Sequence, residues 1–249
     1  MAQTLGGAQW PDSSSGPGGP ASSPGNVVIT GGASGLGAAT VRAVQRHGGN
    51  PLVVDIAKPQ SDVRYAWADL ADTSTVDDAV RELADAVDGQ LHGVFTAAGI
   101  DSCGPLDKVS AKEWERVVHV NLLGTAAVIR AALPYLKSTQ GRIVTVASTL
   151  GIKAVSDATA YCASKFGVVG FTRALAAELA GEVGVTLLIP GGMHTPFFDG
   201  RDEQYKPPPD AKLNEPDNVA ETVVFALNQP AGCEVRELVV CCSEESSWP

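Results

Sequence analysis

The sequence is poor in the features that mark secreted, membrane-spanning and nucleic-acid-binding proteins. Only five of its 249 residues are cysteines, an odd number at irregular spacing, which favours reduced thiols over a disulfide scaffold or a zinc site. Its 18 Lys and Arg are outnumbered by 28 Asp and Glu and form no cluster that could line a phosphate groove. No apolar run approaches the roughly 20 residues that span a bilayer, and the N-terminus lacks the basic start and apolar stretch of a signal peptide. We therefore expect a cytoplasmic protein with small-molecule partners and no nucleic-acid, membrane or metal partner.

The chain divides into a short polar start and one long segment that is able to fold. Residues 1–25 are dominated by Gly, Ser and Pro, which cannot bury enough apolar surface to offset the entropy of ordering, so we predict a flexible tail. Across the whole chain 44% of residues are hydrophobic and 18% are charged, which is sufficient for a large core. We predict a single domain over residues 26–249.

Short β-branched runs alternate with segments of helical apolar spacing from residue 26 onward. The predicted strands cover residues 26–30, 51–55, 63–68, 91–97, 141–148, 184–190 and 234–242. The predicted helices cover residues 35–48, 73–87, 111–137, 158–180 and 216–228, with Thr73 as the N-cap of the second helix. This alternation predicts an α/β fold, a Rossmann-type doubly wound parallel sheet of about seven strands with helices on both faces.

A glycine-rich turn, "TGGASGLG" at residues 30–37, lies between the first predicted strand and the first predicted helix. Glycines let the backbone approach a pyrophosphate, which can then rest on the helix N-terminus, although three glycines can also form an ordinary tight turn. Asp55 ends the second strand about eighteen residues later, where its carboxylate can accept from ribose hydroxyls and repel a 2′-phosphate. The pattern predicts a dinucleotide site that prefers NAD over NADP, with Lys58 as the nearby cation that weakens this preference.

A tyrosine and a lysine stand four residues apart in "YCASK", residues 161–165. On a helix this spacing places Tyr161 and Lys165 on one face, one turn apart. The pair could be incidental on an exposed helix turn. It could also be catalytic, because a neighbouring ammonium stabilises a phenolate and lowers the pKa of the phenol from its ordinary value near 10.

Six motifs favour the catalytic interpretation of Tyr161 and Lys165 over the incidental one. Together and in this order they resemble the short-chain dehydrogenase/reductase family in its compact single-domain form, over residues 26–240. They are "TGGASGLG" at 30–37, "ADL" at 68–70, "TAAG" at 96–99, "HVNLLG" at 119–124, "VTVAST" at 144–149 with "YCASK", and "PGGMHT" at 190–195. The resemblance implies hydride transfer between a nicotinamide and a secondary alcohol or ketone. It also implies a homo-oligomer, a tetramer or a dimer, built through the predicted helices at 111–137 and 158–180.

The resemblance assigns the catalytic roles to four residues. Tyr161 is implied as the acid/base, Lys165 as its acidifying neighbour and ribose ligand, and Ser148 as the donor to the substrate oxygen. Asn121 is implied to hold a water in a proton relay to Lys165. The cofactor-binding residues implied besides Tyr161 and Lys165 are Gly31, Ala33, Ser34, Gly35, Leu36, Gly37, Asp55, Ile56, Asp69, Leu70, Ala97, Ala98, Gly99, Pro190, Gly191, Met193 and Thr195.

Two departures from the family pattern stand out. Thr96 occupies a position where the family most often has Asn, and we expect this change to be structural, without loss of catalysis. The chain ends in "CCSEESSWP", residues 241–249, instead of the common glycine-terminated strand, which puts the subunit contacts of that edge in doubt. Substrate choice is expected in residues 100–108, 149–159 and 194–214, where Phe197, Phe198 and Tyr205 indicate a partly apolar pocket. The alternatives are a catalytically silent NAD-binding sensor and an epimerase or dehydratase on the same fold.

Overall fold

The computed structural model describes residues 23–245 and residue 247, and the predicted flexible tail lies outside these residues up to position 22. The last three residues of that segment are described. Ser23 Oγ donates a hydrogen bond to the Gly48 carbonyl at 2.8 Å. The Asn50 amide donates to the Gly25 carbonyl, also at 2.8 Å, which extends the pairing between the first two strands.

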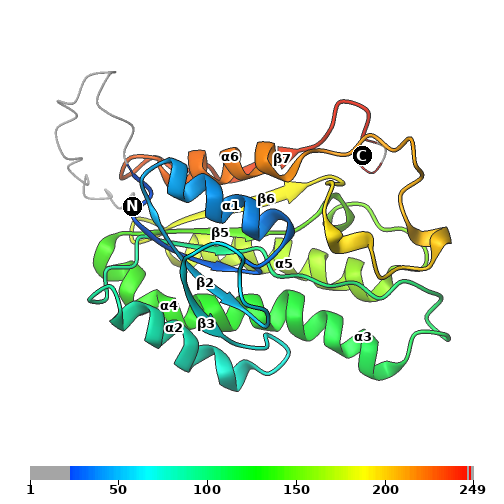
Figure 1. The fold of residues 1–249 in the computed structure, drawn as a ribbon, viewed down its shortest axis with the longest axis horizontal. Helices are drawn as coiled ribbons and strands as arrows, with labels where there is room; N and C mark the ends of the chain where they lie inside the picture. Colours follow the sequence, from blue (N-terminus) through cyan, green and yellow to red (C-terminus); the bar gives the residue numbers. More distant parts are fainter. Residues whose placement is uncertain (1–22, 246, 248–249) are drawn as a thin grey trace, which may run out of the picture.

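A seven-stranded sheet forms the centre of the molecule, with the order β3-β2-β1-β4-β5-β6-β7 (Figure 1). All neighbouring strands are parallel, which confirms the predicted fold class. The strands are β1 (Asn26–Thr30), β2 (Asn50–Asp55), β3 (Arg64–Trp67), β4 (Gly93–Thr96), β5 (Arg142–Val146), β6 (Gly184–Pro190) and β7 (Glu237–Val240). The central strands read as nearly continuous apolar runs because helices cover both of their faces, and every residue of β6 is buried.

Two layers of helices enclose the sheet, as Figure 1 shows. One face is covered by α1 (Gly35–Arg46) and α6 (Pro216–Leu227), whose buried residues form one core cluster with β1. The opposite face is covered by α2 (Val76–Asp85), α4 (Thr125–Thr139) and α5 (Thr159–Glu178), which share a second core cluster. The short helices η1 (Thr73–Thr75), η3 (Thr149–Gly151), η4 (Pro196–Phe198) and η5 (Glu203–Tyr205) lie in the connections.

One long helical stretch runs without interruption through α3 (Ala111–Val118), a π-helical turn η2 (His119–Gly124) and α4. Residues Ala111–Thr139 are long and apolar enough to cross a membrane by length and composition. The expectation that no segment reaches that length was therefore wrong. Half of the apolar window is buried inside the protein, and Val128, Ile129 and Leu136 belong to the core beneath the sheet, so the apolar side chains serve internal packing.

Most predicted elements begin or end within three residues of the observed ones. The N-cap prediction for Thr73 was wrong, because the Asp72 side chain accepts from the Ser74 amide and starts η1 instead. Carboxylates are preferred over threonine at such positions because they accept well from exposed backbone amides. The last predicted strand also begins later than expected, at Glu237.

The order of the strands in the sheet indicates where a ligand site is expected. β1 lies between β2 on one side and β4 on the other, so the connections that leave β1 and β4 diverge. In open parallel sheets the crevice at such a switch point, outside the carboxyl ends of the strands, is where ligands bind. Each predicted motif follows the carboxyl end of a strand or lies on a helix beside it.

Candidate active site

The glycine-rich turn connects β1 to α1 with a backbone that side chains would obstruct. Gly31 has a φ of +69°, and a Cβ on it would lie 2.9 Å from the Ala98 backbone. A Cβ on Gly37 would lie 2.1 Å from the Gly31 carbonyl oxygen. The turn therefore folds tightly onto itself, and it leaves the first amides of α1 free of side-chain caps, since Ser34 makes no capping hydrogen bond. This is the arrangement that suits a pyrophosphate.

Asp55 lies beside this turn at the end of β2. Its carboxylate accepts from the Ala33 amide and from the Ala57 amide, each at 2.9 Å. The carboxylate thus holds the glycine-rich turn beside the end of β2. Ile56 and Lys58 follow it and are exposed.

The predicted adenine-side and central segments meet the turn. Asp69 accepts from the Ala71 amide at 2.9 Å and forms an ion pair with Arg116 at 3.3 Å. The Ala98 amide donates to Thr30 Oγ1 at 3.1 Å, which joins the end of β4 to the end of β1. The remaining predicted members of this group, Leu70, Ala97 and Gly99, flank these contacts in the chain. The residues present thus form a continuous cradle that fits a dinucleotide.

Tyr161 and Lys165 lie on α5 as the spacing predicted, and both are buried, with 9% and 4% of their surface exposed. Lys165 Nζ is 5.6 Å from the centroid of the Tyr161 ring, and it donates to the Val146 carbonyl at 2.9 Å. Ser148 follows β5, forms a hydrogen bond with Tyr161 and accepts from the Leu150 amide at 3.1 Å. Three of the predicted catalytic residues therefore meet at one point.

Asn121 lies in the π-helical turn and is buried. Its side chain accepts from the Ile100 amide at 2.8 Å and donates to the Ile100 carbonyl at 2.9 Å, and it also donates to Ser164 Oγ at 3.0 Å. The side chain therefore ties the loop after β4 to α5. A Cβ on Gly99 would lie 3.6 Å from Lys165 Nζ and 3.5 Å from Asn121 Oδ1, so the three residues are neighbours.

The electrostatics of the pair differ from the expectation that Lys165 lowers the pKa of Tyr161. Burial raises the pKa of the Tyr161 phenol to about 12, and the hydrogen bond with Ser148 opposes this rise only in part. Burial lowers the pKa of Lys165 to about 8. Desolvation penalises both charged forms, and the ammonium is bonded to the Val146 carbonyl. The predicted lowering of the Tyr161 pKa also invoked the positive nicotinamide ring, and it stays a prediction for the cofactor-bound site.

Residues 191–195 follow β6, whose last residue is Pro190, and complete the rim. The Gly192 amide donates to Glu245 Oε2 at 2.9 Å, and a Cβ on Gly191 would lie 2.2 Å from the same oxygen. The unusual C-terminal sequence therefore returns to the site. Met193 pairs with Asn214, and Thr195 is the nearest neighbour of Gly35 in the glycine-rich turn.

Two charged residues at the site were missed by sequence reasoning. Arg201 Nη2 forms an ion pair with Asp101 Oδ2 at 2.8 Å, although the residues are 100 positions apart. The Arg201 guanidinium lies over the rings of Phe197 and Phe198, and Phe197 lies 5.6 Å from the Tyr161 ring. No spacing rule relates these loops, and the apolar character of Phe197 and Phe198 was the one signal available.

A family model described as short chain dehydrogenase matches residues 25–206. Among curated relatives, a (2S)-[(R)-hydroxy(phenyl)methyl]succinyl-CoA dehydrogenase subunit of Thauera aromatica is 32% identical over 240 residues, which are 88% of this chain and 96% of the relative. A cis-4-hydroxycyclohexanecarboxylate dehydrogenase of Sinomonas cyclohexanicum is 31% identical over 231 residues, which are 86% of this chain and 93% of the relative.

Solved structures give the same picture of the fold. A levodione reductase matches with a TM-score of 0.80 and 27% identity, over 90% of this chain and 98% of that chain. An aldohexose dehydrogenase of Thermoplasma acidophilum matches with a TM-score of 0.79, and at 23% identity this likeness concerns the fold alone.

Proposed function

The chain belongs to the short-chain dehydrogenase/reductase family, and from this premise we propose that it transfers a hydride between a nicotinamide and a secondary alcohol or ketone. The observation that carries the proposal is the meeting of Tyr161, Ser148 and Lys165 at the carboxyl end of β5, beside the glycine-rich cradle. The dehydrogenase names of two relatives, each matched over most of its length, support the reaction class.

In the oxidation direction, the alcohol proton must leave as the hydride leaves the carbinol carbon. Tyr161 is the group proposed to take this proton, and in reduction its phenol returns a proton to the developing alkoxide. Its raised pKa keeps the phenol protonated at neutral pH, which suits the donating role. Bound as the oxidised form, the nicotinamide supplies the hydride acceptor and a positive ring charge that favours phenolate.

Ser148 and Lys165 assist Tyr161 in different ways in this proposal. The Ser148 hydroxyl, which already bonds Tyr161, also donates to the substrate oxygen as negative charge develops there. Lys165 contributes positive charge on the inner side of Tyr161 and binds the nicotinamide ribose. Asn121 holds the loop after β4 against α5, and the implied water relay remains a prediction that its side-chain bonds to Ile100 and Ser164 neither require nor exclude.

The central experiment replaces Tyr161 with Phe. This variant keeps the ring and its contact with Phe197 but removes the oxygen, so turnover should fall by roughly 100- to 10,000-fold while cofactor affinity survives. Turnover is followed by NADH absorbance with a panel of cyclic and acyclic secondary alcohols and ketones. Undiminished turnover in Tyr161→Phe would remove Tyr161 from the mechanism.

The same panel separates the alternatives. A catalytically silent sensor would bind cofactor and give no turnover with any alcohol or ketone in the wild-type protein. An epimerase or dehydratase would consume a sugar nucleotide without net formation of NADH. A silent sensor would not need Ser148 and Tyr161 bonded to each other beside Lys165. The segment 194–214 is too short to form the separate substrate domain expected of a sugar-nucleotide epimerase or dehydratase. Cytoplasmic location is part of the proposal.

We propose NAD as the preferred cofactor, because the Asp55 carboxylate ends β2 beside the glycine-rich turn, where it would repel a 2′-phosphate. Its two contacts with the Ala33 and Ala57 amides hold it in that position, and the turn carries no Arg or Lys. Titration calorimetry with NADH and NADPH compares the two affinities directly. Equal or tighter binding of NADPH would contradict the proposed role of Asp55 and would indicate that the exposed Lys58 binds the 2′-phosphate.

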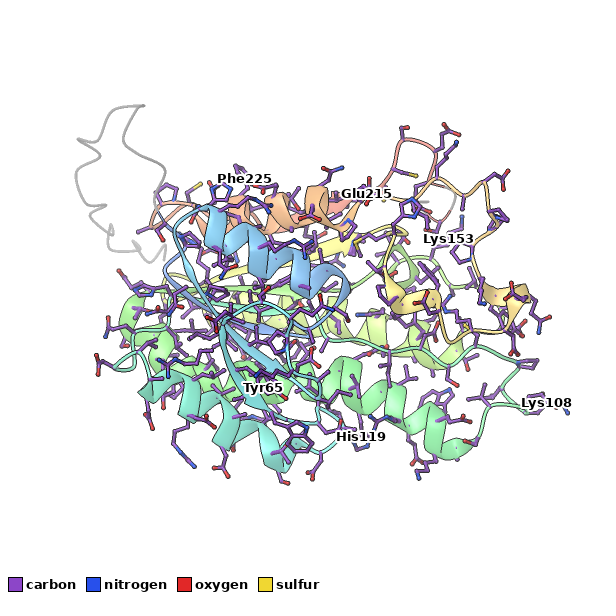
Figure 2. All side chains as sticks on the ribbon, viewed as in Figure 1. Tyr65, Lys108, His119, Lys153, Glu215 and Phe225 are labelled. Carbon is purple, nitrogen blue, oxygen red and sulfur yellow. The ribbon has the colours of Figure 1, made fainter. Side chains whose placement is uncertain are left out.

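We also propose a homo-oligomer, a tetramer or a dimer. Two large apolar side chains are exposed on the proposed contact helices, Leu123 in η2 and Phe166 in α5, each 44% exposed. Phe225 on the outer side of α6 (Figure 2) and Val239 in the edge strand β7 are also exposed, at 56% and 42%. Light scattering that shows only the 25.6 kDa monomer at micromolar concentration would contradict this proposal.

A further inference from the structure

A buried ion pair joins two loops on opposite sides of Tyr161. Asp101 belongs to the loop after β4 and Arg201 to the segment after β6, and only 5% and 17% of their side chains are exposed. Asp101 also accepts from the Ser102 amide at 2.7 Å and from the Cys103 thiol at 3.3 Å. Arg201 Nη1 donates to the Tyr205 carbonyl at 3.3 Å. The pair thus fastens the segment after β6 to a loop that Asn121 already holds in place.

The fastened segment carries the aromatic wall of the site. The Arg201 guanidinium carbon lies 4.8 Å from the Phe197 ring centroid and 4.7 Å from that of Phe198. A guanidinium over an aromatic face at this distance is attracted by the ring, more strongly when water is excluded. Phe197 in turn contacts Tyr161, with 5.6 Å between the ring centroids. Movement of Arg201 would therefore be transmitted to the surface that covers the phenol.

We propose that Asp101 and Arg201 are positioning residues of this active site, which hold Phe197 against Tyr161 and offset each other's charge near the phenol. The proposal rests on the proposed role of Tyr161 as the acid/base. It assigns a function to two residues that none of the six family motifs contains.

The second half of the proposal follows from the charges that face Tyr161. The charged groups are Lys165 from its own helix, Asp101 from the loop after β4 and Arg201 from the segment after β6, and the Cys162 thiol is a further titratable group beside it. The Asp101 carboxylate raises the pKa of Tyr161, and the Arg201 guanidinium lowers it. When one partner of a buried pair is removed, the other remains as an uncompensated charge in a site that screens it poorly. Arg201 without Asp101, or Asp101 without Arg201, would therefore disturb the titration of the phenol.

The test compares Arg201→Gln, Arg201→Lys and the double variant Asp101→Asn/Arg201→Gln by pH profiles of kcat/KM for alcohol oxidation. In Arg201→Gln the Asp101 carboxylate is left alone, so the alkaline rise should move to higher pH by roughly half a unit or more. The double variant removes both charges, so its profile should return toward the wild-type position. Arg201→Lys keeps the positive charge and should also leave the profile in place. All three variants should raise KM, because the fork geometry that holds Phe197 is lost in each.

Asp101 raises the pKa of Lys165, so the double variant changes the titration of Lys165 as well as that of Tyr161. Arg201→Gln keeps Asp101 and is therefore the variant whose profile reports on Tyr161. Arg173→Gln is the matched control, since it breaks an exposed ion pair with Glu237 on the outer side of α5 and should change neither KM nor the profile.

A structural role alone would give the same pH profile in Arg201→Gln and in the double variant, and that result would overturn the proposal. An unmoved profile in Arg201→Gln would overturn it as well. If Arg201→Gln does not fold, the double variant decides: a profile in the wild-type position with raised KM supports the proposal, and a shifted one contradicts it. Tyr161→Phe tests the proposed function separately. If Tyr161 is not the acid/base, this variant retains full turnover, and the pH profiles of the Arg201 variants then do not report on Tyr161.

Discussion

The proposed nucleotide cradle and the proposed substrate side, the two halves of the site, are held together by different forces. In the cradle the backbone itself determines the shape, because Gly31 and Gly37 approach other backbone atoms more closely than any side chain permits. Over Tyr161 the shape depends on side chains, namely the Asp101–Arg201 ion pair and the rings of Phe197 and Phe198.

This difference teaches what each half can tolerate. A cradle built from backbone contacts fails with a single added methyl group, since backbone cannot move aside. A wall built from side chains can be exchanged while the sheet beneath it stays intact, which is how one fold serves many substrates. The predictions below compare equivalent changes in the two halves, or change the residues where the halves meet.

The largest effect is expected for Gly37→Ala in the cradle. The new Cβ would lie 2.1 Å from the Gly31 carbonyl oxygen, so the turn must open, at a cost of roughly 3 kcal/mol or more. Thermal unfolding and NADH fluorescence should both show the loss. Gly200→Ala in the substrate half is the control, because nothing lies within 4 Å of its added Cβ. Equal losses of stability and NADH binding in Gly37→Ala and Gly200→Ala would contradict the view that backbone contacts shape only the cradle.

The next effect is expected at Lys165, where the two halves meet. Its pKa falls from the ordinary value of 10.5 to about 8, so the folded state disfavours the ammonium. Between pH 8 and 10.5 the unfolded chain binds more protons, hence stability should rise with pH there, and the full penalty is present below about pH 8. Lys165→Met should therefore stabilise the protein at pH 7, by at most about 3 kcal/mol, while activity and NAD affinity are lost.

Urea unfolding at pH 7 and at pH 9.5 checks this sign. Wild type should gain stability between the two values and Lys165→Met should not. Tyr161 does not interfere in this window, because its raised pKa affects stability only above about pH 10. A variant that is less stable than wild type at both values would show that the Lys165 bond to Val146 outweighs the burial of the charge.

A smaller effect is expected for Asp55→Asn, which tests the cradle's selectivity. The ratio of NADH to NADPH affinity should fall by roughly 10- to 100-fold, because one charge that repels a 2′-phosphate is removed. One oxygen remains to accept from Ala33 or Ala57, so the turn should stay folded. Asp62→Asn removes an exposed charge from the β2–β3 connection and should leave the ratio unchanged. A similar fall of the affinity ratio in Asp55→Asn and Asp62→Asn would mean that the net charge of the protein, and not the position of Asp55, determines the selectivity.

The sequence predicted the two halves unequally for physical reasons. The glycine-rich turn and the Tyr161–Lys165 pair are local, so their spacing in the chain fixes their spacing in space. Asp101 and Arg201 meet only because β4 and β6 end at the same edge of the sheet, and nothing in either segment specifies the other. Glu245 is a similar case, since a strand-terminal sequence does not show that it returns to Gly192. The burial that raises the pKa of Tyr161 could not be foreseen either, because it depends on the loops that cover the phenol.

The smallest expected effect concerns the strand between the two halves. Thr96 ends β4, and its buried hydroxyl has no hydrogen-bond partner among the residues that the structure describes. Thr96→Val replaces the hydroxyl with a methyl group of similar shape, so it should leave stability unchanged or raise it by about 1 kcal/mol. Thr145→Val on the neighbouring strand β5 is the matched control. Its hydroxyl pairs with Thr172 Oγ1 at 2.7 Å, and its loss should cost roughly 1–2 kcal/mol. Guanidinium unfolding of the two variants gives the difference, and a larger loss in Thr96→Val than in Thr145→Val would mean that the Thr96 hydroxyl has a partner that stabilises β4.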